Sequence, residues 1–263
     1  MKTTIIGVGA MGGALVEGML KCPDTSPSDI TVADPSEAAI NRFIDTGVSQ
    51  TTDNTAAVKG ADIVFVVVKP WLVEKVLGGI KEALDLEKQI IVVVAAGVPS
   101  ESIKLWLDKG DGNTPRLLLA IPNTAIAVRE SMTFLVPAGA SDEDIRLIAL
   151  LFGQLGQCIV TEERLLAAGT TLASCGIAYA MRYVRAAVEG GVEIGFRASD
   201  AEHIVLQTVK GAVSLLQATG EHPEAAIDKV TTPGGVTIKG LNEMEHAGFT
   251  SAVIRGLKAG MGK

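Results

Sequence analysis

Near its start the sequence reads Ile5-Ile6-Gly7-Val8-Gly9-Ala10-Met11-Gly12, a short apolar run that enters the pattern G-x-G-x-x-G. A strand that ends in this pattern and continues into a helix is typical of a dinucleotide-binding turn. The first glycine permits the tight turn, the second lets backbone amides approach a pyrophosphate, and the third lets helix and strand pack closely. The helix N-terminus adds the positive end of its dipole. A purely structural glycine-rich turn is the alternative. The expected cofactor contacts here are Gly7, Val8, Gly9, Ala10, Met11 and Gly12.

A second apolar run, residues 30–33, ends at Asp34, 22 residues after the last glycine of the turn. This is close to the spacing of about 20 residues at which an acidic side chain binds the adenosine ribose. A carboxylate can accept hydrogen bonds from both ribose hydroxyls of NADH, whereas it repels the extra phosphate of NADPH. We therefore expect Asp34 to favour NADH, with NADPH left open because Ser36, Lys69 or Arg42 could offset the repulsion. In the alternative, Asp34 only caps the next helix.

Ligands of open parallel sheets bind beyond the carboxyl ends of the strands, so two later strand ends belong to the same crevice. One ends in a cation and a rigid turn, Val68-Lys69-Pro70, and the next in small residues, Ala96-Gly97, on which a flat nicotinamide can lie. Lys69 is alternatively a solvated surface lysine. Asn54 opens a short helix and is either a cofactor contact or only an N-cap. The expected contacts beyond the glycine turn are Asp34, Asn54, Val68, Lys69, Pro70, Ala96 and Gly97.

Up to about residue 160, short β-branched runs alternate with amphipathic stretches. Continuous apolar runs indicate strands covered on both faces, as in parallel sheets. The alternation predicts a doubly wound α/β domain of the Rossmann type over residues 1–160. The predicted strands are residues 3–6, 30–33, 63–68, 89–94, 117–121, 132–136 and 158–160. The predicted helices are residues 11–20, 37–46, 72–84, 102–107 and 142–155, the last beginning with a capping box of Ser141 and Asp144.

Beyond residue 160 the strand pattern ends, and residues 161–263 are predicted to form an all-helical domain. The predicted helices are residues 171–194, a helix from a capping box of Ser199 and Glu202 to about Ala218, and residues 236–246 and 251–261. The first of these has many small residues and few charges, so the domain alone would leave apolar surface exposed. Interfaces between obligate subunits are as apolar as the interior of a domain, so a second subunit could cover this surface. We therefore predict dimerisation through this domain, with higher homo-oligomers left open.

Composition restricts the partners. The 263 residues are 48% hydrophobic with a net charge of −7, so a large core is available but no basic surface for nucleic acid. The apolar runs are far shorter than the ~18 residues that span a membrane, and glycines and Glu17 interrupt the apolar start, which argues against a signal peptide. Three cysteines without a CxxC pair and three scattered histidines indicate neither disulfides nor a metal site. We expect a cytoplasmic protein that binds no nucleic acid, membrane or metal.

A second informative stretch, Thr231-Thr232-Pro233-Gly234-Gly235-Val236-Thr237, precedes a predicted helix. Two glycines at a helix N-terminus expose consecutive backbone N–H groups, and the threonines add hydroxyl donors. The stretch can therefore bind a carboxylate or a phosphate without a cationic side chain. A loop that only caps the helix is nearly as plausible from these residues alone.

This stretch, continued through Glu245, closely resembles the signature loop and helix of pyrroline-5-carboxylate reductases. The glycine turn, Val68-Lys69-Pro70, Ala96-Gly97, Pro122-Asn123-Thr124 and Ala178-Tyr179 fall in the family's order and spacing. The resemblance covers essentially the whole chain. It implies the last step of proline synthesis, the reduction of L-1-pyrroline-5-carboxylate by NADH or NADPH. It also implies a homodimer with shared active sites, each combining one subunit's cofactor domain with its partner's loop.

On this reading the loop binds a small cyclic imine carboxylate. Backbone N–H groups of Gly235, Val236 and Thr237 would hold the carboxylate with help from the Thr232 hydroxyl, and the Thr237 hydroxyl would be the catalytic contact near the ring nitrogen. A protonated imine accepts hydride without a strong acid, so positioning would dominate catalysis. The expected substrate-binding residues are Thr232, Gly234, Gly235, Val236 and Thr237.

The chain departs from the family pattern at several positions. Leu119 stands where members usually carry arginine, and Ala125 where they carry proline. The family's Gly-Ser-Gly-Pro-Ala-Tyr segment reads Ser174-Cys175-Gly176-Ile177-Ala178-Tyr179 here. Two other functions stay open. One is a two-domain hydroxyacid dehydrogenase, with Lys210 or Lys229 as its general base. The other is a cofactor-binding regulatory protein without catalysis.

Overall fold

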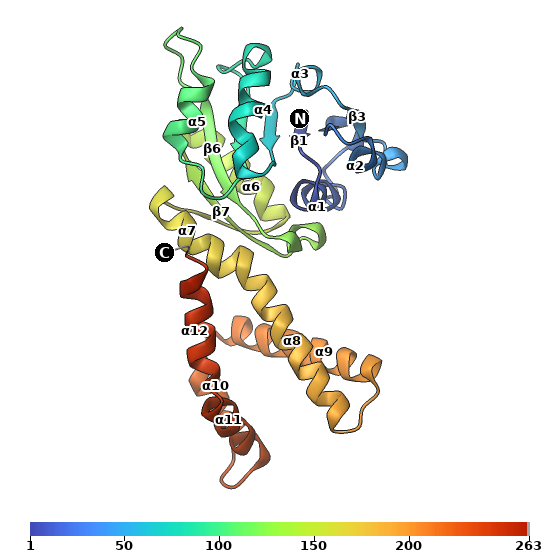
Figure 1. Ribbon diagram of the computed structural model, residues 1–263, viewed down its shortest axis with the longest axis vertical. Helices are drawn as coiled ribbons and strands as arrows, with labels where there is room; N and C mark the ends of the chain where they lie inside the picture. The colour runs from blue at the N-terminus through green and yellow to red at the C-terminus, as the bar shows by residue number, and fades with distance from the viewer. Residues whose placement is uncertain (262–263) are drawn as a thin grey trace. The chain divides into compact units, whose positions relative to one another are not determined.

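The computed structural model describes residues 1–261, which form two compact units that divide between Ser174 and Cys175 (Figure 1). The first unit contains the sheet, whose last strand ends at Val160. In the second, the regular elements of the described residues 175–261 are all helices. The functional boundary expected at residue 160 stays a prediction.

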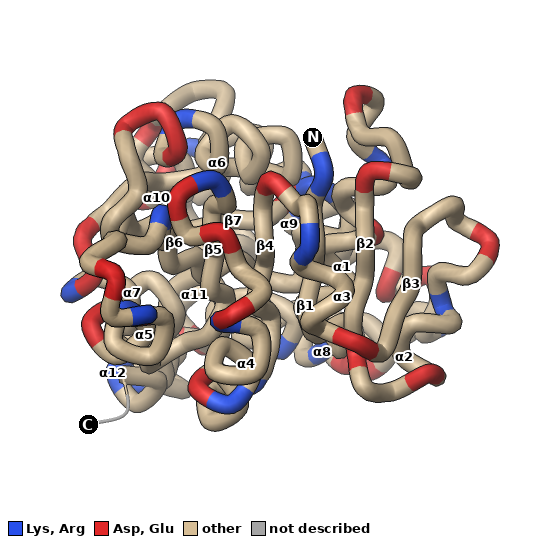
Figure 2. Tube along the Cα trace, turned by 90° about the horizontal axis from the view of Figure 1, so that it is seen from above, with Lys and Arg blue, Asp and Glu red and all other residues tan. Residues whose placement is uncertain are grey.

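The first unit is built on one eight-stranded sheet in the order β3-β2-β1-β4-β5-β6-β7-β8. Figure 2 shows the part of this order from β3 through β2, β1, β4 and β5 to β6. Strands β1 to β6 are parallel, β7 is antiparallel to β6, and β8 is parallel to β7. The register pairs Ile6 with both Ala33 and Val66, and Val66 with Val93, so the carboxyl ends of these strands share one edge. The predicted doubly wound, mostly parallel sheet is confirmed. The strands are β1 (Thr3–Ile6), β2 (Ile30–Ala33), β3 (Ser49–Thr51), β4 (Ile63–Val66), β5 (Ile90–Val93), β6 (Arg116–Ile121), β7 (Ser131–Pro137) and β8 (Gly156–Val160).

Helices cover both faces of this sheet and enclose two apolar cores. The first core includes Leu15 of α1 and Phe152 of α6, whose ring meets Phe65 of β4 edge to face at 5.9 Å. The second includes Leu77 of α4 and Ile103 of α5. The helices of this unit are α1 (Ala10–Met19), α2 (Glu37–Asn41), α3 (Asn54–Ala57), α4 (Val73–Ile80), α5 (Ser100–Leu107), α6 (Asp142–Gln154) and α7 (Leu166–Gly169). The short turns are η1 (Pro27–Asp29), η2 (Ile44–Thr46), η3 (Pro70–Leu72), η4 (Lys81–Ala83), η5 (Thr124–Val128) and η6 (Glu163–Leu165), and a π-helical segment, η7 (Thr170–Cys175), ends at the division.

The described part of the second unit, residues 175–261, forms five helices that bury almost no side chain among themselves. Within residues 175–261 only Ala201 is buried. It packs against Gly191, where an added Cβ would lie 2.9 Å from the Cβ of Ala201. Large apolar side chains such as Met181 and Ile194 are exposed. A cavity of about 570 Å³ opens between α8, α11 and α12. The helices are α8 (Gly176–Glu193), α9 (Ala198–Thr219), α10 (Pro223–Lys229), α11 (Val236–His246) and α12 (Phe249–Ala259).

Two predicted helix starts have different outcomes. The capping box of Ser141 and Asp144 is confirmed, since each side chain bonds the other's backbone N–H. The capping box of Ser199 and Glu202 is wrong. Helix α9 begins at Ala198 after Arg197, without a side-chain cap, so Ser199 already lies in its first turn.

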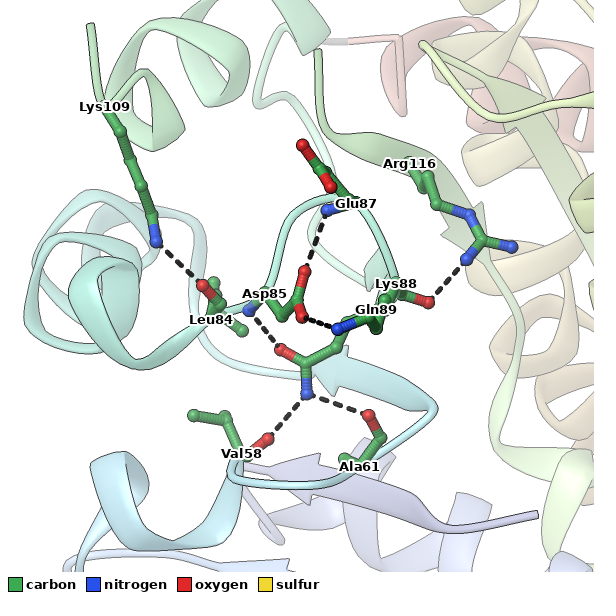
Figure 3. Close-up of polar contacts among 9 residues, drawn as sticks. All are labelled: Val58, Ala61, Leu84, Asp85, Glu87, Lys88, Gln89, Lys109 and Arg116. Atoms are coloured by element: carbon green, nitrogen blue, oxygen red, sulfur yellow. Dashed lines mark hydrogen bonds and ion pairs between the residues drawn. The ribbon is translucent and has the colours of Figure 1, made fainter. Parts of the chain in front are cut away.

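At the amino edge of the sheet, the buried side chain of Gln89 joins two connections (Figure 3). Its amide nitrogen donates to the carbonyl oxygens of Val58 and Ala61 at 2.6 and 2.8 Å. Its amide oxygen accepts from the backbone N–H of Asp85 at 2.8 Å. The segment between α3 and β4 is thereby fixed to the turn before β5.

Candidate active site

The glycine turn leaves β1 at the carboxyl edge and becomes the N-terminus of α1. Gly7 has φ = +89°, and a Cβ there would lie 2.3 Å from the carbonyl oxygen of Val67. A Cβ at Gly12 would lie 1.8 Å from the carbonyl oxygen of Gly7. Both positions therefore require glycine, one for conformation and one for close helix packing.

The N-terminus of α1 is uncovered. Gly9 is its N-cap, provides no side-chain cap, and has open space where a Cβ would stand. The first backbone N–H groups of a helix have no partner within it, so those of Ala10, Met11 and Gly12 are available to a ligand. Ala10 is exposed and Met11 is half-buried. The turn therefore fits a bound pyrophosphate.

Asp34 directly follows β2 and holds this turn in place. One carboxylate oxygen accepts from the backbone N–H of Val8 at 2.9 Å, and the other accepts from the backbone N–H of Ser36, also at 2.9 Å. The N-cap of α2 is Ser36, whose hydroxyl accepts from the N–H of Ala39. Asp34 is thus not the cap of α2, and its half-buried carboxylate stands beside the phosphate turn.

Arg42, the cation nearest to this stretch in sequence, is already paired. Its guanidinium donates to the carboxylate of Glu17 at 2.5 Å and lies 4.8 Å from the ring centre of Phe43. It lies against Gly13, where a Cβ would come within 2.3 Å of it. Its charge is therefore largely compensated by α1.

Asn54 lies at the first position of α3. The N-cap is Asp53, whose carboxylate accepts from the N–H groups of Thr55 and Ala56, so the N-cap interpretation of Asn54 is wrong. The amide oxygen of Asn54 is buried and accepts no hydrogen bond from any residue within 1–261. A buried acceptor without a donor is costly, so this oxygen fits a ligand that brings a donor.

The ends of β4 and β5 lie at the same edge. Val68 packs against Gly7, where a Cβ would lie 2.8 Å from the Cγ1 of Val68. Lys69 is exposed, precedes Pro70 of η3, and forms no ion pair with the described residues. Ala96 and Gly97 (φ = +76°) are exposed, with open space around Gly97. The structure thus brings together every predicted cofactor contact that follows a strand.

Beyond β6, the Pro122-Asn123 stretch connects to the π-helical segment. The hydroxyl of Ser174 donates to the carbonyl oxygen of Pro122 at 2.7 Å, and the amide oxygen of Asn123 accepts from the N–H of Ala125. Leu119, the first departure from the family pattern, is 2% exposed within the second core. It is a packing residue and contributes no charge to the edge.

The second predicted site, the Thr231–Thr237 loop, starts α11. Gly234 has φ = +71°, and the N–H of Gly235 donates to the carbonyl oxygen of Thr232 at 2.9 Å. A Cβ on Gly235 would lie 2.5 Å from the Thr232 hydroxyl oxygen. Both glycines are therefore required by the turn. Thr237 is exposed, and Val236 is 85% exposed.

Gly235 is the N-cap of α11 and offers no side-chain cap. The N–H groups of Val236, Thr237 and Ile238 have no partner within the helix, because they belong to its first turn. These three donors lie beside the threonines of the loop, and residues 231–237 themselves include no basic side chain. This arrangement fits a carboxylate.

Two negative observations concern the described part of the chain. Residues 1–261 contain no group of His, Cys, Asp and Glu side chains placed to hold a metal ion. Across the same residues, none of the helices is both long enough and apolar enough to cross a membrane.

A mostly parallel sheet in this order, with a glycine turn after β1 and an acidic residue after β2, defines the class of protein as a Rossmann-type dinucleotide-binding protein. A family model described as "Pyrroline-5-carboxylate reductase dimerisation" matches residues 163–263, and one described as "NADP oxidoreductase coenzyme F420-dependent" matches residues 2–97. The chain belongs to the pyrroline-5-carboxylate reductase family.

Individual relatives agree with this assignment. Pyrroline-5-carboxylate reductase 2 of Dictyostelium discoideum is 34% identical over 96% of this chain and 88% of its own length. Pyrroline-5-carboxylate reductase 1 of the same organism is 39% identical over 96% of this chain, which spans about half (47%) of that relative. The crystal structure of Plasmodium falciparum pyrroline carboxylate reductase with NADP bound has the same fold, with a TM-score of 0.89 at 22% identity over 99% of this chain and 95% of that one.

Proposed function

We propose that the protein reduces L-1-pyrroline-5-carboxylate to L-proline with a hydride from NADH or NADPH. The observation that carries this proposal is the start of α11, where three N–H groups without a partner in the helix and two threonine hydroxyls form an anion site, and residues 231–237 include no ionisable side chain that could act as a base. Such a site suits a substrate that carries a carboxylate and whose reacting carbon is already electrophilic. A protonated cyclic imine meets that description, because its carbon accepts hydride and its nitrogen needs only to be held.

The residues of the carboxyl edge fit the cofactor. The N-terminus of α1 holds the pyrophosphate, Asp34 accepts from the adenosine ribose, and Ala96 and Gly97 leave room for the nicotinamide. When bound, the reduced nicotinamide supplies the hydride. Because Asp34 is anionic and Arg42 is paired with Glu17, the ribose pocket favours NADH over NADPH.

The loop residues then position the imine. The N–H groups of Val236 and Thr237 bind the substrate carboxylate, and the N–H of Gly235 keeps the loop closed through its bond to Thr232. The Thr232 hydroxyl adds a donor for the same carboxylate. The Thr237 hydroxyl accepts from the protonated ring nitrogen and holds it while the positive charge is lost.

Each active site combines two subunits. The second unit buries almost no side chain by itself, and its family model is one of dimerisation. Apolar helices of this kind are covered when two copies associate. In the proposed homodimer the loop of one protomer faces the cofactor edge of its partner.

The test is an assay of NADH and NADPH oxidation with the cyclic imine against a panel of 2-oxoacids. We expect oxidation of the reduced cofactor with the imine and none with the 2-oxoacids. Oxidation with 2-oxoacids but not the imine would instead indicate a hydroxyacid dehydrogenase. That alternative needs Lys210 or Lys229 as its base; Lys229 is paired with Glu221 at 2.6 Å, which leaves Lys210 as the candidate. Cofactor binding without any oxidation would indicate the regulatory alternative.

A further inference from the structure

Trp71 is an exposed aromatic residue at the cofactor edge. After β4 ends at Val66, the N–H of Val67 still bonds the carbonyl oxygen of Ile6 at 2.8 Å, and the chain then turns through Lys69 into η3. Trp71 is the second residue of η3 and is 75% exposed. The chain has only two tryptophans, and the other, Trp106, packs against the second core. A large exposed ring beside a ligand crevice is a candidate contact for that ligand.

The neighbours of Trp71 place it on a defined side of the crevice. Helix α4 begins two residues later at Val73 and packs in the second core, on the face of the sheet opposite α1. Helix α3 lies along α4, where the hydroxyl of Thr55 donates to the carbonyl oxygen of Gly79. Asn54, with its unsatisfied amide oxygen, begins α3. The N-terminus of α1 thus bounds one side of the edge, and Asn54 and η3 bound the other.

We propose that Trp71 is the stacking partner of the adenine base of the dinucleotide. If the pyrophosphate lies on α1 and the adenosine ribose at Asp34, the base extends to the opposite side of the edge, between α3 and η3. An indole ring stacks on the face of an adenine without needing a specific hydrogen bond. The proposal rests on the cofactor site proposed above, but not on the identity of the substrate.

Intrinsic fluorescence tests this directly, because the variant Trp106→Phe leaves Trp71 as the sole indole. ADP-ribose carries the adenine half of the cofactor, whereas nicotinamide mononucleotide and inorganic pyrophosphate lack adenine. We expect saturable quenching of Trp71 by ADP-ribose and none by the other two. Trp71→Ala should weaken ADP-ribose binding by about 5- to 100-fold, the range for loss of one base stack. Trp71→Phe should retain part of the affinity, and the matched control Leu105→Ala, which truncates an exposed side chain on α5, should bind as the parent does.

Three results would overturn the proposal. ADP-ribose could bind the Trp106→Phe variant by calorimetry without changing its emission, or Trp71→Ala could bind ADP-ribose as tightly as the parent. Dissociation of the Trp71→Ala dimer in sedimentation would assign the ring to a subunit contact instead. If NADH is oxidised with the imine in any of these cases, only the stacking proposal fails. Quenching by ADP-ribose without imine reduction would contradict only the proposed reaction.

Discussion

The carboxylate of Asp34 accepts a hydrogen bond of 2.9 Å from the backbone N–H of Val8, so the acid after β2 and the phosphate turn after β1 form one assembly. The side chain therefore has a structural role in addition to its proposed contact with the ribose. A variant that removes only the charge separates the two roles. Asparagine comes nearest to this, because its amide oxygen can still accept from the N–H of Val8, while its amide nitrogen no longer accepts from the N–H of Ser36.

Asp34→Asn and Asp34→Ser should both raise kcat/KM for NADPH relative to NADH, by about tenfold or more, since one decade corresponds to 1.4 kcal/mol. The reason is the loss of repulsion between the carboxylate and the 2′-phosphate. Steady-state kinetics with both cofactors measure the ratio. Asp45→Asn, which removes an exposed acid on η2, is the control. A parent that strongly prefers NADPH, with a ratio unchanged in both variants, would show that Asp34 does not face the ribose.

Thr237→Val keeps the side-chain volume but removes the hydroxyl proposed to face the imine nitrogen. Turnover should fall about 10- to 1000-fold, the range for one preorganised polar contact, with little change in thermal stability. Thr208→Val is a matched control, because the Thr208 hydroxyl only bonds a carbonyl of its own helix, α9. Unchanged turnover in Thr237→Val would mean that the hydroxyl has a role only at the start of helix α11 and does not contact the imine.

Subunit mixing tests the shared site. Gly9→Glu blocks the phosphate turn, since the open space at Gly9 is where the cofactor would lie, and Thr237→Val disables the loop. Heterodimers of the two should contain one intact site, so mixing should restore part of the activity, and dilution of the parent should inactivate it. Each variant incubated alone is the control. Absence of recovery after subunit exchange has been verified would mean that each protomer holds a complete site.

The ion pair of Arg116 and Asp144 should contribute to stability in a pH-dependent way. Asp144 is 1% exposed and accepts from the Arg116 guanidinium, which lowers the pKa of the Asp144 carboxyl. Because the pKa is lower in the folded state, this stabilisation is present above the ordinary value near 3.9 and is lost as the pH falls through the lower folded value. Asp144→Asn should therefore reduce the free energy of unfolding by about 1–3 kcal/mol at neutral pH.

Urea unfolding at neutral pH and below the ordinary carboxyl pKa measures this contribution. The difference between parent and Asp144→Asn should shrink on acidification. Asp142→Asn, an exposed acid in the same first turn of α6, is the control and should change stability by only a few tenths of a kcal/mol. An equal difference at both pH values would mean that the Asp144 charge is not involved.

Much of the fold could be predicted because the signals are local. The apolar runs at residues 3–6 and 30–33 match β1 and β2, and the helix predicted over residues 236–246 matches α11. β3 was missed because Ser49-Gln50-Thr51 is short, polar and at the sheet edge, so neither face forces an apolar pattern. Helix α10 was missed although Pro223 at its first position and His222 as its N-cap are start signals.

In the candidate site, too, local features could be predicted from the sequence, whereas features that depend on tertiary packing could not. The glycine turn and the Thr231–Thr237 loop could be predicted, since their backbone donors follow from consecutive residues. The bond between Val8 and Asp34 joins residues 26 apart and depends on the register of β1 and β2. The buried amide oxygen of Asn54 depends on how α3 packs. Sequence spacing alone contains neither.

Gln89 has a consequence of its own. Its carboxamide donates hydrogen bonds to two carbonyl oxygens and accepts one from an N–H, so one side chain joins three main-chain groups from two different connections. Few side chains can substitute, because glutamate cannot donate, lysine cannot accept, and a shorter asparagine would not span the gap. The two edges of the sheet therefore tolerate substitution differently. At the amino edge, position 89 requires a side chain that both donates and accepts hydrogen bonds. At the carboxyl edge, residues can vary with the ligand that is bound.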